Sequence, residues 1–270
     1  MYSEPASSAH YHGIIDTHAH MDDPCFCDHL SEVLASEQEK GVEMIIQSGS
    51  ELPSSRRSVE LACKYDCLVA SVGVYPDEVL GIPEDYLDQI RELACSTKRV
   101  VAIGEIGMDR GFPGHPPMEP QERVFREQLD LAGELQLPVV IHNWDADEDV
   151  LRVLKDYTGI SGAIHRIFSE LSYAKQFLEM GLYMGIGPQV TYPGSKKLVD
   201  LVREMPLERL ILETDAPFLP THGMEGQKAL PSMIADVADK IAAIRTDCTP
   251  QEVIDVARVN AIRLYNLPLR

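Results

Sequence analysis

The chain has 270 residues, 44% of them apolar and 25% charged, which is the composition of a folded globular protein and excludes extended disorder. The formal net charge of −19 argues against binding to anionic membranes and polyanions unless positive charge is concentrated locally or supplied by metal ions. No apolar run approaches the roughly 20 residues of a membrane span, so the sequence predicts a cytoplasmic protein.

The length is close to the roughly 250 residues typical of one (β/α)8 barrel, and we expect a single domain over residues 13–270. Residues 1–12 form a short polar leader without the basic start and apolar core of a signal peptide. The six cysteines are scattered without CxxC pairs, which predicts free thiols. The oligomeric state stays open, with a monomer as the simplest case.

Short apolar runs alternate with longer segments of helical period, a pattern typical of repeated β-α units and a parallel sheet. Most of these runs are rich in Val and Ile, as expected for strands covered on both faces. The eight runs begin near Gly13, Val42, Leu68, Val100, Leu137, Gly162, Tyr183 and Leu210. We therefore expect an α/β protein with eight parallel strands.

The segments between the runs carry signals for the start and the end of helices. Residues 121–135 place apolar side chains mostly on one face, which predicts an amphipathic helix before the fifth strand. Gly41 and Gly181 stand where helices should end, because glycine adopts the left-handed conformation without a Cβ clash. The spacing of a capping box occurs twice, in Asp145 with Glu148 and in Thr249 with Glu252.

Five of the apolar runs lead to a residue that can bind a metal ion. These residues are His18 and His20 in the first run, Glu105 in the fourth, His142 in the fifth, His165 in the sixth and Asp215 in the eighth. An open doubly wound sheet would instead have a glycine-rich first turn. Only a closed ring brings the first and last strands together, so the sequence predicts a (β/α)8 TIM barrel with all these side chains in one cup.

The residue types suit a metal centre. His18 and His20 are two apart, so on an extended strand their side chains face the same side and can bind one ion. Glu105 follows a buried run, where a carboxylate is costly unless it is paired or metal-bound. Asp215 could hold a metal with one oxygen and accept a proton from water with the other. Each residue alone has an ordinary structural interpretation, and their combination is what predicts the site.

Other polar residues and loops lie near the expected ligands. Asp109 should be either a loop residue or an acid that supports the ligands, and Glu213 should support them as well. The loops at residues 111–120 and 217–226 should cover the site. Among the remaining histidines we expect rim contacts from His115 and His222 and surface positions for His10, His12 and His29. The chain has no G-x-S-x-G elbow, no phosphate-binding G-x-x-x-x-G-K-[ST] loop and no cysteine with a local activation signature.

In this order, the motifs resemble the TatD family of metal-dependent hydrolases, within the wider amidohydrolase-like barrels. The most specific parts are residues 102–109 and 213–217. The resemblance implies two divalent ions (Mg, Mn or Zn), with His18, His20 and Asp215 on one, His142 and His165 on the other, and Glu105 bridging. It also implies that metal-activated water attacks a phosphodiester, with Asp215 and Glu105 as catalytic residues, as in family members that degrade single-stranded DNA in the 3′–5′ direction.

The chain departs from the family pattern where phosphate would be bound. The arginine expected two residues after His142 is replaced by Trp144, the family's Gly-Val-His-Pro has Tyr75 in place of histidine, and the loop after the last strand keeps only Lys228 as a basic residue. Because phosphate contacts supply most of the affinity of non-specific nucleic-acid binding, these losses should weaken it. Candidates to compensate are Arg166, Arg110, Lys196 and Lys197, with Trp144 either stacked on a base or packed at the rim.

Three functions are therefore open at this stage. The first is a phosphodiesterase acting on single-stranded DNA. The second keeps the metals and hydrolyses an ester, phosphoester, amide or lactone bond in a small molecule. The third is a barrel that has lost catalysis and serves as a scaffold, against which the complete ligand set argues.

Overall fold

The computed structural model describes residues 11–111 and 114–268, and its strands form one parallel sheet in sequence order. The strands are β1 (Ile14–Ala19), β2 (Val42–Ser48), β3 (Leu68–Val72), β4 (Val100–Asp109), β5 (Val139–Trp144), β6 (Gly162–Ile164), β7 (Tyr183–Ile186) and β8 (Leu210–Leu212). A parallel bridge between Ala19 and Ala216 joins β1 to the segment that follows β8. The predicted (β/α)8 TIM barrel is confirmed. Most of the leader, residues 1–10, lies outside the described residues.

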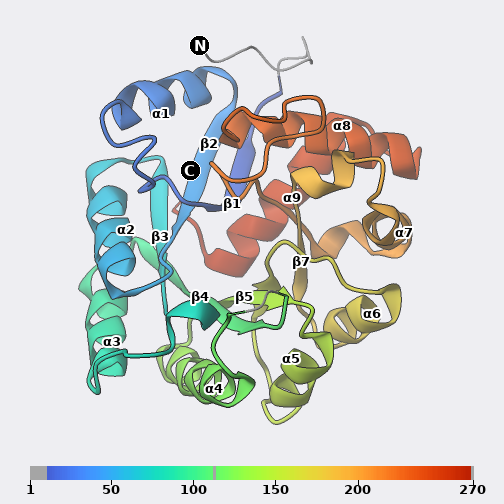
Figure 1. Ribbon diagram of the computed structural model, residues 1–270. Helices are drawn as coiled ribbons and strands as arrows, with labels where there is room; N and C mark the ends of the chain where they lie inside the picture. The colour runs from blue at the N-terminus through green and yellow to red at the C-terminus, as the bar shows by residue number, and fades with distance from the viewer. Residues whose placement is uncertain (1–10, 112–113, 269–270) are drawn as a thin grey trace.

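Helices surround the ring of strands (Figure 1). They are α1 (Leu30–Glu39), α2 (Leu52–Lys64), α3 (Tyr86–Ser96), α4 (Met118–Leu135), α5 (Asp147–Leu154), α6 (Leu171–Glu179), α7 (Lys196–Glu204), α8 (Ile234–Arg245) and α9 (Pro250–Tyr265), with short 3-10 turns at Pro76–Glu78, Pro188–Thr191, Leu207–Arg209 and Pro231–Met233. Among the described helices, none combines the length and apolar character that a bilayer span requires.

Alternate residues along the strands pack into two separate apolar layers. Ile14 of β1 belongs to the large layer between strands and helices, whereas its neighbour Ile15 points into the barrel. Leu264 and Tyr265 of α9 pack against this interior layer. The helix therefore closes one end of the barrel, and the carboxyl ends of the strands remain as the open end.

The predicted helix signals have mixed outcomes. Gly41 and Gly181 have φ values of 94° and 87° directly after α1 and α6, as predicted. The capping box of α9 is confirmed, because Thr249 and Glu252 each accept a hydrogen bond from the other's backbone N–H. The predicted box at Asp145 with Glu148 is wrong. Asp145 has φ 51°, α5 begins two residues later, and acidic residues in its first turn favour the helix through its dipole instead.

Candidate metal centre

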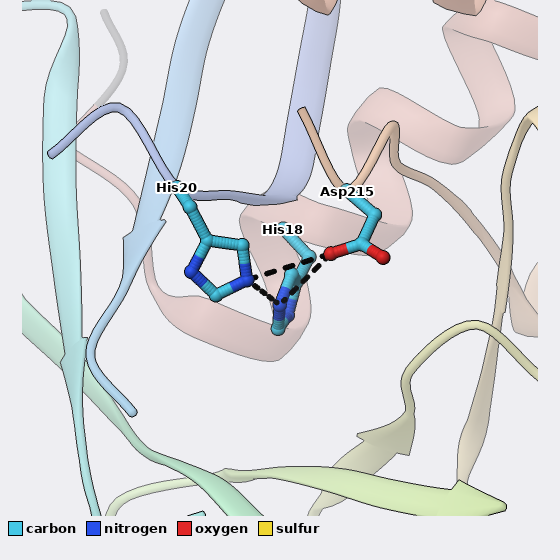
Figure 2. A group of neighbouring side chains, drawn as sticks. All are labelled: His18, His20 and Asp215. Atoms are coloured by element: carbon cyan, nitrogen blue, oxygen red, sulfur yellow. Dashed lines mark hydrogen bonds and ion pairs between the residues drawn. The ribbon is translucent and has the colours of Figure 1, made fainter. Parts of the chain in front are cut away.

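Three of the predicted ligands meet where the barrel closes. His18 lies in β1, His20 follows that strand, and Asp215 follows β8; Figure 2 shows their side chains pointing toward one another. The Nε2 atoms of the two histidines are 3.2 Å apart. Asp215 Oδ1 lies 3.4 Å from Nε2 of His20 and 3.9 Å from Nε2 of His18. Three donor atoms therefore face one point in a buried pocket.

These spacings suit a divalent ion. Ligands bound at about 2.0–2.1 Å in tetrahedral geometry stand about 3.3 Å apart, close to two of the three distances here. Two imidazoles and a carboxylate are also donors that Zn and Mn accept. His18, His20 and Asp215 form one of two groups of converging donors found among the described residues.

The second group consists of His18, Glu105 and His165. Glu105 Oε2 is 3.3 Å from His18 Nε2, and its Oε1 is 3.8 Å from His165 Nε2 and 2.9 Å from His142 Nδ1. The carboxylate of Glu105 thus lies between three histidines, His18, His142 and His165, which come from different parts of the barrel. The structure brings all six predicted ligands together, with His142 outside both converging groups, and their division between two ions stays a prediction.

Glu105 and His142 lie inside their strands, whereas the sequence placed them at strand ends. β4 continues to Asp109 beside β5, pairing Gly107 with His142. A Cβ at Gly104 would stand 2.6 Å from Val140 Cβ, and one at Gly107 would stand 2.0 Å from the carbonyl oxygen of His142. The two glycines therefore let the backbones approach closely, and the ladder runs past the ligands.

Asp109 and Tyr75 hold the ring of His142. Asp109 is the last residue of β4 and is buried, so of its two predicted roles, a loop residue or an acid that supports the ligands, the structure shows the second. Its Oδ2 lies 2.8 Å from His142 Nε2, and the Tyr75 hydroxyl lies 3.2 Å from the same nitrogen. With Glu105 at Nδ1, both ring nitrogens are engaged, and such contacts fix the orientation of an imidazole.

Glu213, which directly follows β8, supports the site, as predicted. Its Oε1 lies 3.0 Å from His165 Nδ1 and also accepts a hydrogen bond from the backbone N–H of Arg166. Arg166 and Asp215 have φ values of 47° and 62°, a left-handed conformation that costs non-glycine residues free energy. Such strain persists only where surrounding contacts hold it, and here it lies at the candidate centre.

Asp16 connects the two ends of the sheet. Its Oδ1 accepts hydrogen bonds from the backbone N–H groups of His18, at 3.1 Å, and Thr214, at 3.0 Å. Burial raises the pKa of this carboxyl to about 8, against these hydrogen bonds, which lower it. Asp16 therefore ties β1 to the segment that carries Asp215.

The charges within the cluster are complementary. Burial by itself would lower the pKa of His20, but the hydrogen bond and charge of Asp215 raise it to about 9. For His142, burial is likewise outweighed by Asp109 and Glu105, and its pKa is about 9. Burial would raise the pKa values of Glu105 and Asp215, but the neighbouring histidines hold both below their usual range. The carboxylates thus demand positive charge, which either protons or metal ions can supply.

Five of the six predicted ligands, all but His18, line a cavity of about 270 Å³ at the open end of the barrel. The sequence analysis missed two of the residues that line this cavity, Ser50 and Phe218. Phe218 is 59% exposed, and its ring centroid lies 5.3 Å from that of His20. Its only signal was its place in the 217–226 loop. His222 lines a different cavity, and His115 Nε2 stands 3.7 Å from Asp109 Oδ1, behind His142.

The fold and the buried donor set define a metal-dependent hydrolase of the (β/α)8 barrel class. The chain belongs to the TatD family, since the family model for TatD related DNases matches residues 15–266.

Two of its relatives are similar along nearly the whole chain, and a third is similar along about three quarters of it. The Bacillus subtilis protein YabD, an uncharacterized metal-dependent hydrolase, is 35% identical over 94% of this chain and 99% of its own length. The crystal structure of Escherichia coli YjjV, a TatD homologue, has 32% identity and a TM-score of 0.90 over 95% of this chain and 99% of that one. A Klebsiella pneumoniae protein named 3′-5′ ssDNA/RNA exonuclease TatD is 34% identical over 78% of this chain and 83% of its own.

Proposed function

We propose that this TatD-family hydrolase cleaves phosphodiester bonds, removing nucleotides from the 3′ end of single-stranded DNA. The observation that carries the proposal is the convergence of His18, His20 and Asp215 at the open end of the barrel, beside a second donor group that shares His18 and adds Glu105 and His165. The name of the Klebsiella relative supports the choice of bond and substrate.

His18, His20 and Asp215 would hold one divalent ion, and Glu105 with His165 and His142 would hold a second. Two bound ions would lower the pKa of a water and offset charge on the attacking and leaving oxygens. Asp215 stays ionised at neutral pH, because neighbouring histidines lower the pKa of its carboxyl. We assign to Asp215 the acceptance of the proton from the attacking water. Phe218, exposed at the mouth, offers a face for a nucleobase.

A second candidate is hydrolysis of a small ester, phosphoester, amide or lactone. It is favoured because two of the basic residues that the sequence suggested for phosphate binding form ion pairs with acidic residues. Arg110 pairs with Asp149 at 2.7 Å, and Lys197 pairs with Glu170 at 3.0 Å. A cation that is already paired with an acid contributes less to the affinity for a long phosphate backbone.

The test is cleavage of a 5′-labelled single-stranded oligonucleotide by chelator-stripped protein, with Mn, Mg or Zn added back. We expect stepwise shortening from the 3′ end that needs metal and is lost in Glu105→Ala. Glu119→Ala, which removes an exposed acid at the start of α4, is the matched control and should cleave normally. An intact oligonucleotide beside stoichiometric bound metal would overturn the proposal, and turnover of esters or lactones by that protein would establish the second candidate.

A further inference from the structure

Arg166 places a positive charge among the carboxylates of the candidate site. Among the described residues that line the cavity, it is the only lysine or arginine. Its Nη1 lies 3.1 Å from Asp215 Oδ2, and its side chain is 28% exposed. Glu105, Asp109, Glu213 and Asp215 all place carboxylates in or next to the cavity. An anionic substrate entering here would meet repulsion that Arg166 is placed to offset.

The guanidinium is held from several sides. Its Cζ lies 5.1 Å from the ring centroid of Trp144, a cation–π distance. The indole is itself backed by Phe168, whose ring is nearly parallel at 15°, with 6.3 Å between centroids. It also packs on Gly111, where an added Cβ would stand 1.9 Å from Trp144 Cδ1. Trp144 is therefore a packed support for Arg166, which is the rim-packing interpretation of this residue.

Being held in advance matters for binding. A long side chain loses conformational freedom when it engages a ligand, and a group already in place loses less. The backbone contributes as well, since Arg166 has φ 47° and donates its N–H to Glu213. The guanidinium fork also keeps donors for a ligand. Nη1 contacts Asp215, whereas the buried Nε has no hydrogen-bond partner within the described part of the chain.

We propose that Arg166, positioned by Trp144, binds an anionic oxygen of the substrate and selects phosphoesters over neutral esters. This inference rests on the proposed function, and it names a contact for the phosphoryl group. Guanidinium groups suit the task because their planar N–H donors match phosphate oxygens. The cation thus comes from the loop after β6, while the end of β5 supplies the aromatic support.

The test compares Arg166→Gln with the matched control Lys197→Gln, which removes a neighbouring charge that already pairs with Glu170. Calorimetry with inorganic phosphate on metal-reconstituted protein measures binding without turnover. We expect Arg166→Gln to weaken phosphate binding about 10- to 100-fold and Lys197→Gln to change it less than about 3-fold. Arg166→Gln should also raise KM for bis(p-nitrophenyl) phosphate by a larger factor than KM for the neutral p-nitrophenyl acetate. Arg166→Lys, which keeps the charge and loses the fork, should give intermediate affinity.

Trp144 is tested as a positioning residue. It is the only tryptophan of the chain, so its emission should change when phosphate binds the wild type and stay constant in Arg166→Gln. Trp144→Phe should keep phosphate affinity, whereas Trp144→Leu should weaken it about 3- to 30-fold, the range of a cation–π contact.

The outcomes separate the two proposals. If the metal-loaded wild type neither binds phosphate nor cleaves a phosphodiester, the proposed function fails and the role of Arg166 fails with it. If the wild type cleaves phosphodiesters but Arg166→Gln binds phosphate as well as wild type, only the role of Arg166 is overturned. An equal loss in Lys197→Gln would also overturn it, because the effect would then be one of general charge.

Discussion

Gly185 of β7 leaves space for the carboxylate of Glu213, so a single methyl group should disturb the metal centre. A Cβ at this position would stand 2.3 Å from Glu213 Oε2 and 2.7 Å from its Cδ. Non-bonded atoms prefer separations of about 3.5 Å, so Gly185→Ala must displace the carboxylate by roughly 1 Å. Glu213 lies 3.0 Å from His165 Nδ1, and the displacement should therefore reach a predicted ligand.

The cost has two parts. Overpacking a buried site lowers the free energy of unfolding by about 1–3 kcal/mol. Loss of the partner that orients a ligating histidine typically weakens metal binding by about 10- to 100-fold, and a 1 Å misplacement costs about 100-fold in rate. The matched control is Gly133→Ala in α4, where an added Cβ meets no atom within 4 Å. This variant should raise the free energy of unfolding by about 0.5–1 kcal/mol.

Urea denaturation, metal content after dialysis and kcat/KM would be measured on both variants and on wild type. We expect Gly185→Ala to fold, to retain less metal and to turn over slowly, while Gly133→Ala keeps wild-type metal content and rate. Wild-type metal affinity and turnover in Gly185→Ala would refute the reasoning, because Glu213 would then be free to move without consequence for His165.

Three further predictions concern pH, helix capping and the mouth of the cavity. In metal-free protein the pKa values of His20 and His142 are raised to about 9 from 6.5, so their contribution to stability is full below pH 6.5 and is lost as the pH rises through 9. Metal affinity should rise over the same pH range, because the histidines lose their protons. Melting temperatures measured with and without chelator from pH 6 to 9.5 check the stability and the metal affinity, and a metal-free melting temperature that does not change with pH would contradict the prediction. Thr249→Ala should lower the free energy of unfolding by about 1 kcal/mol in urea titrations, because it removes the cap of α9, and an unchanged midpoint would disprove the cap's role. Phe218→Ala should leave stability within about 0.5 kcal/mol of wild type. It should raise KM for an oligonucleotide about 5- to 100-fold if the ring stacks on a base, and an unchanged KM would exclude stacking.

Local patterns in the chain were sufficient for the fold class and for the identity of the candidate ligands. Apolar runs that alternate with helical segments predict parallel strands, since both signals depend on neighbouring residues only. The spacing of His18 and His20 predicted that they face the same side, and their Nε2 atoms are 3.2 Å apart. The capping box at Thr249 could be predicted for the same reason, because both partners lie within one helical turn.

The predictions that failed depended on contacts between distant residues. Asp145 has the spacing of a cap, but the chain leaving β5 gives it a left-handed backbone, and α5 begins beyond it. The end of β4 could not be located from the sequence. The strand extends to Asp109 because the backbone of Gly107 can pack closely against His142 of β5. Asp109, for which the sequence left a loop position open, consequently ends β4 beside His142.

The sequence by itself thus determined which side chains are available for a metal centre and at which strand each is found. Only the tertiary structure decided how they meet. Ala19 bridges Ala216 across the closure of the barrel, and this contact sets the distances from Asp215 to His18 and His20. The stack of Arg166 on Trp144 likewise joins the segment that follows β6 to the end of β5. Such distances depend on the register and closure of the whole sheet, which no local stretch of sequence encodes.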